Sequence, residues 1–255
     1  MKTVLITGAS SGIGKELAYV FAEQKYNLII TARRKNRLEE IKRDIENKHN
    51  VSVHLFDMDL SVGGSAEKLY KKVKDNKLQI DVLINNAGFG MKGGFSEIDP
   101  DKEERMLFLN MISLTKLSRL FGKDMVETGQ GHIINIASTA AFQPVPWLAA
   151  YSATKAYVLS FSEAIAFELK DDNVKVTVIN PGVTRSEFSQ VAGFEKEPNT
   201  GTKIPTSRDV AEFTYRMMKN GKVMAIHGFM NNLMATGQRF TPRGLTTKIA
   251  GKMMK

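Results

Sequence analysis

Short apolar stretches rich in β-branched residues alternate with stretches of helical periodicity along this chain. Each apolar stretch is nearly continuous, which is typical of a strand buried on both faces of a parallel sheet. The repeated order of strand and helix predicts an α/β fold of the Rossmann type, a doubly wound parallel sheet of about seven strands with helices on both sides. The strands are expected at Thr3–Thr7, Tyr26–Ala32, Val51–Asp57, Ile80–Asn85, Gly131–Ala137, Val174–Asn180 and Val223–His227.

The length of 255 residues suits one such α/β domain, so residues 1–255 are predicted to form a single domain. Residues 187–206 have few apolar runs and carry two prolines, and we expect them to form a lid over the substrate. Residues 229–255 are expected to form a helical, basic C-terminal extension.

The net charge of +9 is concentrated near the end of the chain, because eight lysines and arginines but no acid follow Glu212. The C-terminal extension is also amphipathic, and we expect it to pack on a partner subunit in a homodimer or homotetramer. A basic face in solvent, a weak contact with an anionic membrane surface and a contact with an acidic carrier protein are alternatives. No nucleic-acid or metal-binding pattern is expected. The absence of cysteine fits a cytoplasmic location.

The first expected strand runs into TGASSGIG, at Thr7 to Gly14, and a helix follows. Such a turn is an anion site, because the first-turn N–H groups lack intrahelical partners and the helix dipole adds partial positive charge. The glycines allow a tight turn, close approach of a pyrophosphate and close packing of the helix. Their spacing differs from the commoner G-x-G-x-x-G pattern, so a purely structural turn is the alternative. The residues expected to bind a dinucleotide here are Gly8, Ser10, Ser11, Gly12, Ile13 and Gly14.

The second expected strand ends in Arg33 and Arg34, at the place where an NAD site usually has an acid for the ribose 2′-hydroxyl. A guanidinium group suits a phosphate instead. The sequence therefore predicts NADP(H), bound by Arg33 with Arg34 and Lys15 assisting. The alternative, a basic helix start exposed to solvent, fits Lys35 and Arg37 better.

Tyr151 and Lys155 are four residues apart in AAYSATKAY and so share one face of a helix. A phenol has an ordinary pKa of about 10, which a neighbouring ammonium group would lower toward the range useful for proton transfer. Ser138 ends an expected strand just before this helix. Its hydroxyl can therefore hold a carbonyl oxygen beside the phenol.

Five short motifs follow one another along the chain. They are TGASSGIG, NNAG at 85–88, NIAS ending in Ser138, YSATK with Tyr151 and Lys155, and NPG at 180–182. With them the chain resembles the short-chain dehydrogenase/reductase family over nearly its whole length, as an NADP-preferring member. Its C-terminal extension is similar to that of the ketoacyl-reductase-like or DltE-like subgroup.

The resemblance implies roles for four catalytic residues. Tyr151 would donate a proton during carbonyl reduction, and Ser138 would orient the substrate oxygen. Lys155 would lower the pKa of Tyr151 and bind the nicotinamide ribose. Asn110, in FLNMIS, would hold a water in a proton relay with Lys155, although its residue type alone suggests an ordinary polar position within a helix.

The resemblance also implies further cofactor contacts. Asp59 would bind the adenine amine, with Leu60 beside the ring. Ser186 matches a position where the family usually has a threonine that contacts the nicotinamide carboxamide, and Thr184 is the alternative. The implied cofactor residues beyond the glycine turn and the arginines are Asp59, Leu60, Asn86, Ala87, Gly88, Tyr151, Lys155, Pro181, Gly182, Thr184 and Ser186.

The substrate is expected to lie between residues 89–95, 139–150 and the lid. Phe142 and Trp147 favour an apolar portion of the substrate, with Ser138 at its reacting oxygen. The alternative is that both aromatic side chains pack under the lid or at a subunit contact.

The expected function is NADPH-dependent reduction of a ketone or aldehyde to an alcohol. A 3-oxoacyl thioester reductase acting on an acyl carrier and a small hydroxy-acid dehydrogenase are alternatives within the same chemistry. An NADP(H)-sensing protein without chemistry is an alternative of another class, against which the intact set of four catalytic residues argues.

Overall fold

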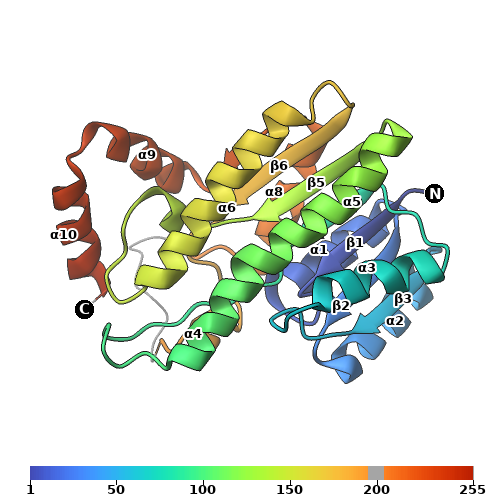
Figure 1. Cartoon of the computed structure of the whole chain (residues 1–255), viewed down its shortest axis with the longest axis horizontal. Helices are drawn as coiled ribbons and strands as arrows, with labels where there is room; N and C mark the ends of the chain where they lie inside the picture. The colour runs from blue at the N-terminus through green and yellow to red at the C-terminus, as the bar shows by residue number, and fades with distance from the viewer. Residues whose placement is uncertain (195–203, 255) are drawn as a thin grey trace.

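The computed structural model describes residues 1–194 and 204–254. These residues form a parallel sheet of seven strands in the order β3-β2-β1-β4-β5-β6-β7 (Figure 1). The winding reverses between β1 and β4, which makes the sheet doubly wound, as predicted. The strands are β1 (Thr3–Thr7), β2 (Asn27–Ala32), β3 (Val53–Asp57), β4 (Val82–Asn85), β5 (Gly131–Ile136), β6 (Val174–Asn180) and β7 (Met224–Ile226).

Helices connect these strands and extend the chain beyond β7. The helices are α1 (Gly12–Glu23), α2 (Lys35–Lys48), α3 (Ser65–Asp75), α4 (Pro100–Leu107), the π-helix η1 (Phe108–Ser113), α5 (Leu114–Thr128), the short 3₁₀-helix η2 (Thr139–Phe142), α6 (Ala149–Glu168), α7 (Phe188–Val191), α8 (Ser207–Lys219), α9 (Phe229–Gly237), the 3₁₀-turn η3 (Gln238–Phe240) and α10 (Arg243–Met254). None of the helices in the described ranges is long and apolar enough to cross a bilayer.

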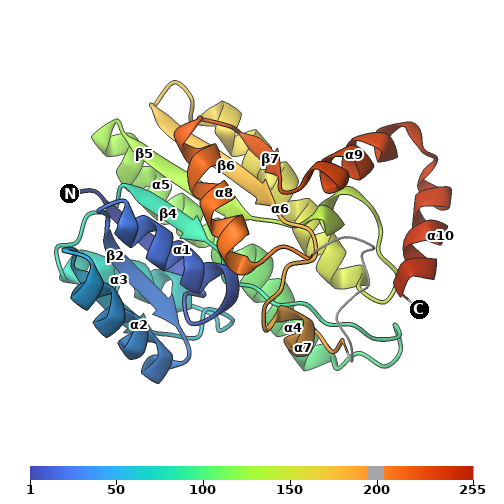
Figure 2. The ribbon, with the colours of Figure 1, turned by 180° about the vertical axis from the view of Figure 1, so that it is seen from behind.

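The two faces of the sheet are covered by different helices. Helices α3, α5 and α6 lie over the face seen in Figure 1, and α1, α2 and α8 lie over the face seen in Figure 2. Phe21 of α1 and Phe121 of α5 are fully buried on opposite sides of the sheet. Burying an aromatic or aliphatic side chain of this size stabilises the fold by about 1.5–3 kcal/mol, so both layers hold the sheet in place.

Most strands begin one or two residues later than the sequence predicts. Strand β3 starts at Val53 instead of Val51, and β4 starts at Val82 although Ile80 is already buried. An apolar pattern indicates which residues are buried, and residues that precede a strand in the chain can be buried without pairing in the sheet. The outermost strands also differ from the prediction of burial on both faces, because β3 and β7 lie at the edges of the sheet and are partly exposed.

The helices after β7 form an extension that we call the C-terminal arm (Phe229–Met254), seen beyond the end of α6 in Figure 1. The arm folds back on the residues that precede α6. Gln238 Nε2 donates to Gln143 Oε1 at 2.8 Å. A Cβ at Gly251 would lie 3.3 Å from Pro146, so α10 also packs closely on this segment. Residues 195–203 of the expected lid lie outside the described residues.

Candidate active site

The loops that follow β1 to β6 all start at the carboxyl ends of the parallel strands, which form one edge of the sheet. Doubly wound folds bind ligands at this edge. The sequence-predicted residues gather there because each directly follows a strand. These loops carry Gly8 after β1, Arg34 after β2, Asp59 after β3, Asn86–Gly88 after β4, Ser138 after β5 and Pro181–Gly182 after β6.

The glycine turn after β1 is shaped by close backbone contacts. Gly8 and Gly12 have φ of +70° and +55°, which a residue with a side chain rarely adopts. A Cβ on Gly14 would lie 2.3 Å from the carbonyl oxygen of Gly8, so only glycine permits this packing of α1 on the turn. The N-terminus of α1 lies at a cavity of about 670 Å³. Because the turn has no bulky side chains, it exposes its backbone N–H groups to this cavity, as an anion site requires. Ile13, also predicted to bind the cofactor, packs on the core beneath.

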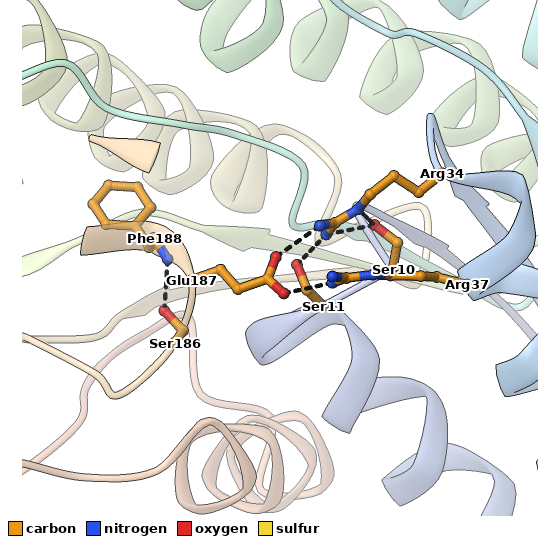
Figure 3. Close-up of polar contacts among 7 residues, drawn as sticks. All are labelled: Ser10, Ser11, Arg34, Arg37, Ser186, Glu187 and Phe188. Atoms are coloured by element: carbon orange, nitrogen blue, oxygen red, sulfur yellow. Dashed lines mark hydrogen bonds and ion pairs between the residues drawn. The ribbon is translucent and has the colours of Figure 1, made fainter. Parts of the chain in front are cut away.

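Arg34 is the arginine that contacts the glycine turn (Figure 3). Its guanidinium group donates to Ser10 Oγ at 3.1 and 3.2 Å and to Ser11 Oγ at 2.6 Å. Arg33, predicted as the principal phosphate ligand, is exposed and acts electrostatically on Asp59 instead. Of the two arginines, Arg34 is thus the one that contacts the serines of the glycine turn, and the binding of a phosphate by either arginine stays a prediction. Lys15 lines the same cavity, with its amine 5.9 Å from the ring centre of Tyr19.

Glu187 and Arg37 are brought to the glycine turn by tertiary contacts. The Glu187 carboxylate pairs with Arg34 at 2.7 Å and also with Arg37. Arg37, at the basic start of α2, is thus only partly exposed to solvent and is paired with Glu187. Lys35 fits the prediction of a basic helix start in solvent, since it makes only a loose 3.8 Å pair with Glu39 of its own helix.

A threonine hydroxyl connects the loop after β4 to the glycine turn. Thr7 Oγ1 accepts the backbone N–H groups of Asn86 at 3.0 Å and Ala87 at 2.9 Å. The Asn86 side chain donates to the carbonyl oxygen of Thr7 at 2.9 Å. These bonds hold Asn86–Gly88 beside the turn, as the cofactor assignment needs.

Asp59 is held by the residue two positions further on. Its Oδ1 accepts the backbone N–H of Ser61 at 2.9 Å and the Ser61 hydroxyl at 2.6 Å. Burial acts to raise the pKa of Asp59, but these hydrogen bonds and the nearby arginines outweigh it, so the pKa is lowered and the carboxylate stays ionised. Leu60 is buried next to it.

Tyr151 and Lys155 of α6 are both buried at this edge, with the Lys155 amine 5.7 Å from the centre of the Tyr151 ring. Burial raises the pKa of the Tyr151 phenol to about 12, while a hydrogen bond with Ser138 acts in the opposite direction. Burial also lowers the pKa of Lys155 to about 8. The structure therefore does not show the expected lowering of the phenol's pKa by Lys155, because desolvation dominates both groups.

Asn110 lies in the π-helix η1 and is buried. Its Nδ2 donates to the carbonyl oxygen of Phe89 at 3.0 Å and to the Thr154 hydroxyl at 3.1 Å. A Cβ on Gly88 would lie 2.9 Å from Asn110 Oδ1 and 3.6 Å from the Lys155 amine, so these groups surround the same point. A local π-helix is frequent at functional sites, and here it directs Asn110 toward α6.

The segment after β6 crosses the site toward α1. The carbonyl oxygen of Pro181 accepts a hydrogen bond from the backbone N–H of Thr139. A Cβ on Gly182 would lie 2.4 Å from the Asn231 side chain of α9. Thr184 Oγ1 donates to the carbonyl oxygen of Gly182, whereas Ser186 lies 3.3 Å from the position of a Cβ on Gly12. Of the two predicted alternatives, Ser186 is thus the one that faces the glycine turn.

An apolar cluster surrounds the Tyr151 ring and forms the expected substrate wall in part. Phe188 is nearest, with ring centres 5.4 Å apart. Trp147 packs against α10 of the same chain, since its Cζ3 lies 3.6 Å from the position of a Cβ on Gly251. Phe142 is half-buried outside this cluster. The cluster consists of Met106, Val145, Leu148 and Tyr151, with Phe89, Met91, Leu107, Ala140, Ala150, Phe188, Phe194 and Met254 packed against it.

Sequence reasoning missed Arg37, Glu187 and Phe188 as individual residues of the site. Phe188 and Glu187 directly follow Ser186 in TRSEF, so their nearness to the motif was the available signal. Arg37 carried no such signal, because its partner is 150 residues away in the chain.

Comparisons with known proteins agree with this geometry. A family model described as short chain dehydrogenase matches residues 2–196. The chain is 31% identical over 223 residues to the very-long-chain 3-oxoacyl-CoA reductase of Vanderwaltozyma polyspora, covering 83% of this chain but only 62% of that relative. It is 34% identical over 196 residues to the NADP-dependent 3-hydroxy acid dehydrogenase of Schizosaccharomyces pombe, covering 74% of each protein.

Among solved structures, a short-chain dehydrogenase from Sphingobium yanoikuyae in complex with NADPH has a TM-score of 0.84 and 30% identity. The alignment covers 96% of this chain and 95% of that one. The family match spans most of the chain, and the solved structure shares both its sheet and its length. The chain therefore belongs to the short-chain dehydrogenase family.

Proposed function

We propose that the protein is an NADP(H)-dependent oxidoreductase that reduces a ketone or aldehyde to an alcohol, with Tyr151 as the proton donor. The observation that carries the proposal is the buried Tyr151 phenol, hydrogen-bonded to Ser138 and one helical turn from the buried Lys155. The pair lies at the sheet edge where the glycine turn offers an anion site.

The residues of this edge fit the cofactor. Gly12 and Gly14 leave bare backbone at the N-terminus of α1 for a pyrophosphate, and Arg34 with Ser10 and Ser11 suits a phosphate on the adenine ribose. The Schizosaccharomyces pombe relative is NADP-dependent and the Sphingobium yanoikuyae structure contains NADPH, which supports the same choice. We assign the remaining implied contacts to Asp59, Leu60, Asn86–Gly88, Pro181, Gly182 and Ser186.

When bound, the reduced cofactor supplies the hydride. The Ser138 and Tyr151 hydroxyls donate hydrogen bonds to the substrate oxygen, where negative charge builds in the transition state. Because burial raises the pKa of Tyr151 to about 12, the phenol is protonated at neutral pH and can act as an acid. The protonated phenol is the form that carbonyl reduction requires.

Lys155 and Asn110 act on the Tyr151 proton indirectly. The Lys155 amine donates to the carbonyl oxygen of Ile136 at 2.9 Å, which fixes it beneath the phenol. A positive charge there stabilises the phenolate as its proton leaves. Asn110 holds the loop at Phe89 and the α6 residue Thr154, so it keeps the space beside Lys155 open for a proton relay.

The test measures loss of NADPH absorbance with ketones, aldehydes, 3-oxo acids and 3-oxoacyl thioesters, in the wild type, Tyr151→Phe and Tyr157→Phe. Tyr157 is the matched control, since it lies on the same helix with its hydroxyl 2.9 Å from Thr115 and is partly exposed. We expect Tyr151→Phe to lower kcat by about 10²–10⁴-fold and Tyr157→Phe to have little effect. Equal turnover in the wild type and Tyr151→Phe would reject Tyr151 as the proton donor. NADPH binding without turnover of any substrate would favour the sensing alternative.

A 3-oxoacyl thioester is the substrate class favoured by a specific observation. The C-terminal arm places Met254 against the apolar cluster around Tyr151, and the arm is rich in lysine and arginine. An apolar wall beside basic residues suits an acyl chain on an anionic carrier. The Vanderwaltozyma polyspora relative, a 3-oxoacyl-CoA reductase, supports this class, and the Schizosaccharomyces pombe relative supports a small 3-hydroxy acid. The substrate panel distinguishes the two.

A homo-oligomer formed through the C-terminal arm and a cytoplasmic location stay predictions. Exposed apolar side chains on the arm, Phe229, Leu233, Phe240 and Met253 among them, support a contact with a second copy. Ending the chain after Gly237 is expected to lower the molar mass measured by light scattering. An unchanged mass would exclude α10 as the contact, and co-sedimentation of the full chain with anionic vesicles would favour a membrane surface.

A further inference from the structure

Three consecutive residues after β6, Ser186–Phe188, contact three different parts of the site, and we call them the latch. Figure 3 shows the latch beside Arg34 and Arg37. Ser186 faces the glycine turn at Gly12. Glu187 pairs with the two arginines of α2 and its start. Phe188 covers the Tyr151 ring, and its amide donates to Ser186 Oγ at 3.2 Å. Because these residues are adjacent and the Phe188 amide is bonded to Ser186, a displacement of the backbone at Glu187 would move its two neighbours as well.

Glu187 takes the arginine N–H groups that a phosphate would use. Its Oε2 accepts from Arg34 Nη1 at 2.7 Å and its Oε1 accepts from Arg37 Nη1. Both arginines lie where β2 ends and α2 begins, the place at which this family of folds binds the adenine ribose. A carboxylate and a phosphate monoester are both bidentate acceptors for guanidinium groups, so they compete for the same donors.

Arg34 keeps further partners when it releases Glu187. Its other nitrogens donate to the hydroxyls of Ser10 and Ser11, which point to the same place. Hydrogen bonds from Arg37 and then Arg34 lower the pKa of Glu187 to about 2, so the carboxylate is ionised at neutral pH. Both ion pairs are partly exposed, with about two fifths of each side chain accessible. They are therefore weak enough for a phosphate of nearly two negative charges to displace.

Phe188 connects this competition to the reacting groups. Its ring tip lies 3.0 Å from the position of a Cβ on Gly90, in a space that only glycine leaves. On the other side, the Lys92 N–H donates to the carbonyl oxygen of Ala192 at 2.7 Å, just after α7. The latch thus lies between the arginines and the substrate wall, in contact with both.

We propose that Glu187 is an internal competitor for the 2′-phosphate of NADP(H), and that displacement of its carboxylate by this phosphate shifts Phe188 relative to Tyr151. The proposal depends on the proposed cofactor. It makes Glu187 a residue that determines cofactor specificity, because a dinucleotide without the phosphate leaves the latch on the arginines. It also couples binding of the cofactor phosphate to the position of the Phe188 ring over Tyr151.

The first test is calorimetric titration with adenosine 2′,5′-bisphosphate, with 5′-AMP, which lacks only the 2′-phosphate, and with 5′-ADP. These ligands report on the phosphate without any turnover. We expect Glu187→Gln to tighten binding of the bisphosphate by about 3- to 30-fold, from the loss of two partly exposed ion pairs. Binding of 5′-ADP should change by less than about twofold, since weak exposed pairs matter little to a ligand that does not displace them. The matched control is Glu40→Gln, which removes a charge lining the same cavity, and it should leave both affinities nearly unchanged.

The outcomes separate this proposal from the proposed cofactor. If the wild type binds the bisphosphate no more tightly than 5′-AMP, the NADP(H) assignment itself fails. If the wild type prefers the bisphosphate but Glu187→Gln binds it equally or more weakly, Glu187 is not a competitor. If Glu40→Gln tightens binding as much as Glu187→Gln does, long-range charge explains the effect and the ion pairs do not.

The second test is hydrogen exchange of the 186–194 segment. We expect adenosine 2′,5′-bisphosphate to accelerate exchange there in the wild type, because release of Glu187 loosens the latch, whereas 5′-ADP should not. Glu187→Gln should show the faster exchange without any ligand. Unchanged exchange with the bisphosphate would overturn the coupling to Phe188.

Discussion

Replacing Thr7 by valine tests how the glycine turn is connected to the loop after β4. Thr7 is 1% exposed, and its hydroxyl accepts the amides of Asn86 and Ala87. The Asn86 amide also donates to the carbonyl oxygen of Ile84 at 3.1 Å, so it keeps a partner when the hydroxyl is lost. The Ala87 amide loses the acceptor that the hydroxyl provides.

The expected loss of stability follows from these contacts. A buried amide without an acceptor costs about 1–3 kcal/mol, and weakening the second amide adds about 1 kcal/mol. Valine keeps the shape of threonine, so no cavity is added. The free energy of unfolding should therefore fall by about 2–4 kcal/mol, which for a chain of this size lowers Tm by roughly 4–15 °C. Adenosine 2′,5′-bisphosphate should also bind more weakly, because Asn86–Gly88 is no longer held beside the turn.

Thr7→Ser is the matched control, since it keeps the hydroxyl and loses one methyl group, at a cost of about 1 kcal/mol. Urea unfolding of the wild type and both variants gives the comparison. The smaller serine is therefore expected to be better tolerated than the more apolar valine. A valine variant as stable as the serine variant would refute it, because the hydroxyl would then contribute nothing.

Three further predictions concern other sites. Gly14→Ala should destabilise the fold by about 3 kcal/mol, since its Cβ would meet the carbonyl of Gly8. Thermal melting tests this prediction. The control is Gly237→Ala, for which no loss is expected because nothing lies within 4 Å of the added Cβ. Burial lowers the pKa of His132 to about 4, so its neutral ring gives stability that is present above about pH 6.5 and is lost as the pH falls toward 4. In urea titrations at several pH values, His132→Gln should remove about 3 kcal/mol of the fall in the free energy of unfolding between pH 6.5 and 4. An unchanged slope of that free energy against pH would contradict this expectation. Arg208→Ala should cost no more than about 1 kcal/mol by urea unfolding, because its ion pairs are partly exposed, and a larger loss would show them to be stronger than surface pairs.

The sheet could be predicted because its determinants are local. Runs such as Val4–Ile6 and Val176–Ile179 are continuous and fully buried in the structure, and each is followed by a helix. Burial and periodicity both act over a few residues, so sequence reports them directly. The starts of β3 and β4 could not be predicted equally well, because pairing depends on the length of the neighbouring strand.

The glycine turn and the α6 pair could also be predicted, since each is a motif within one segment. Which arginine contacts the glycine turn could not, because this contact joins the start of α2 to serines about 24 residues earlier in the chain. The pKa of Tyr151 depends on burial, which comes in part from Phe188 and Met106 in other segments. The position of Glu187 depends on the path of the chain after β6. Tertiary contacts decide each of these.

The packing of α10 on Trp147 has a consequence for how such a protein can diversify. Gly251 lies against Pro146 and Trp147, and Met254 reaches the apolar cluster around Tyr151. Exchanges within α10 would therefore reshape the wall of the proposed substrate site while the sheet and the glycine turn stay unchanged. Such exchanges would let selectivity for substrate change while the affinity for nucleotide is kept.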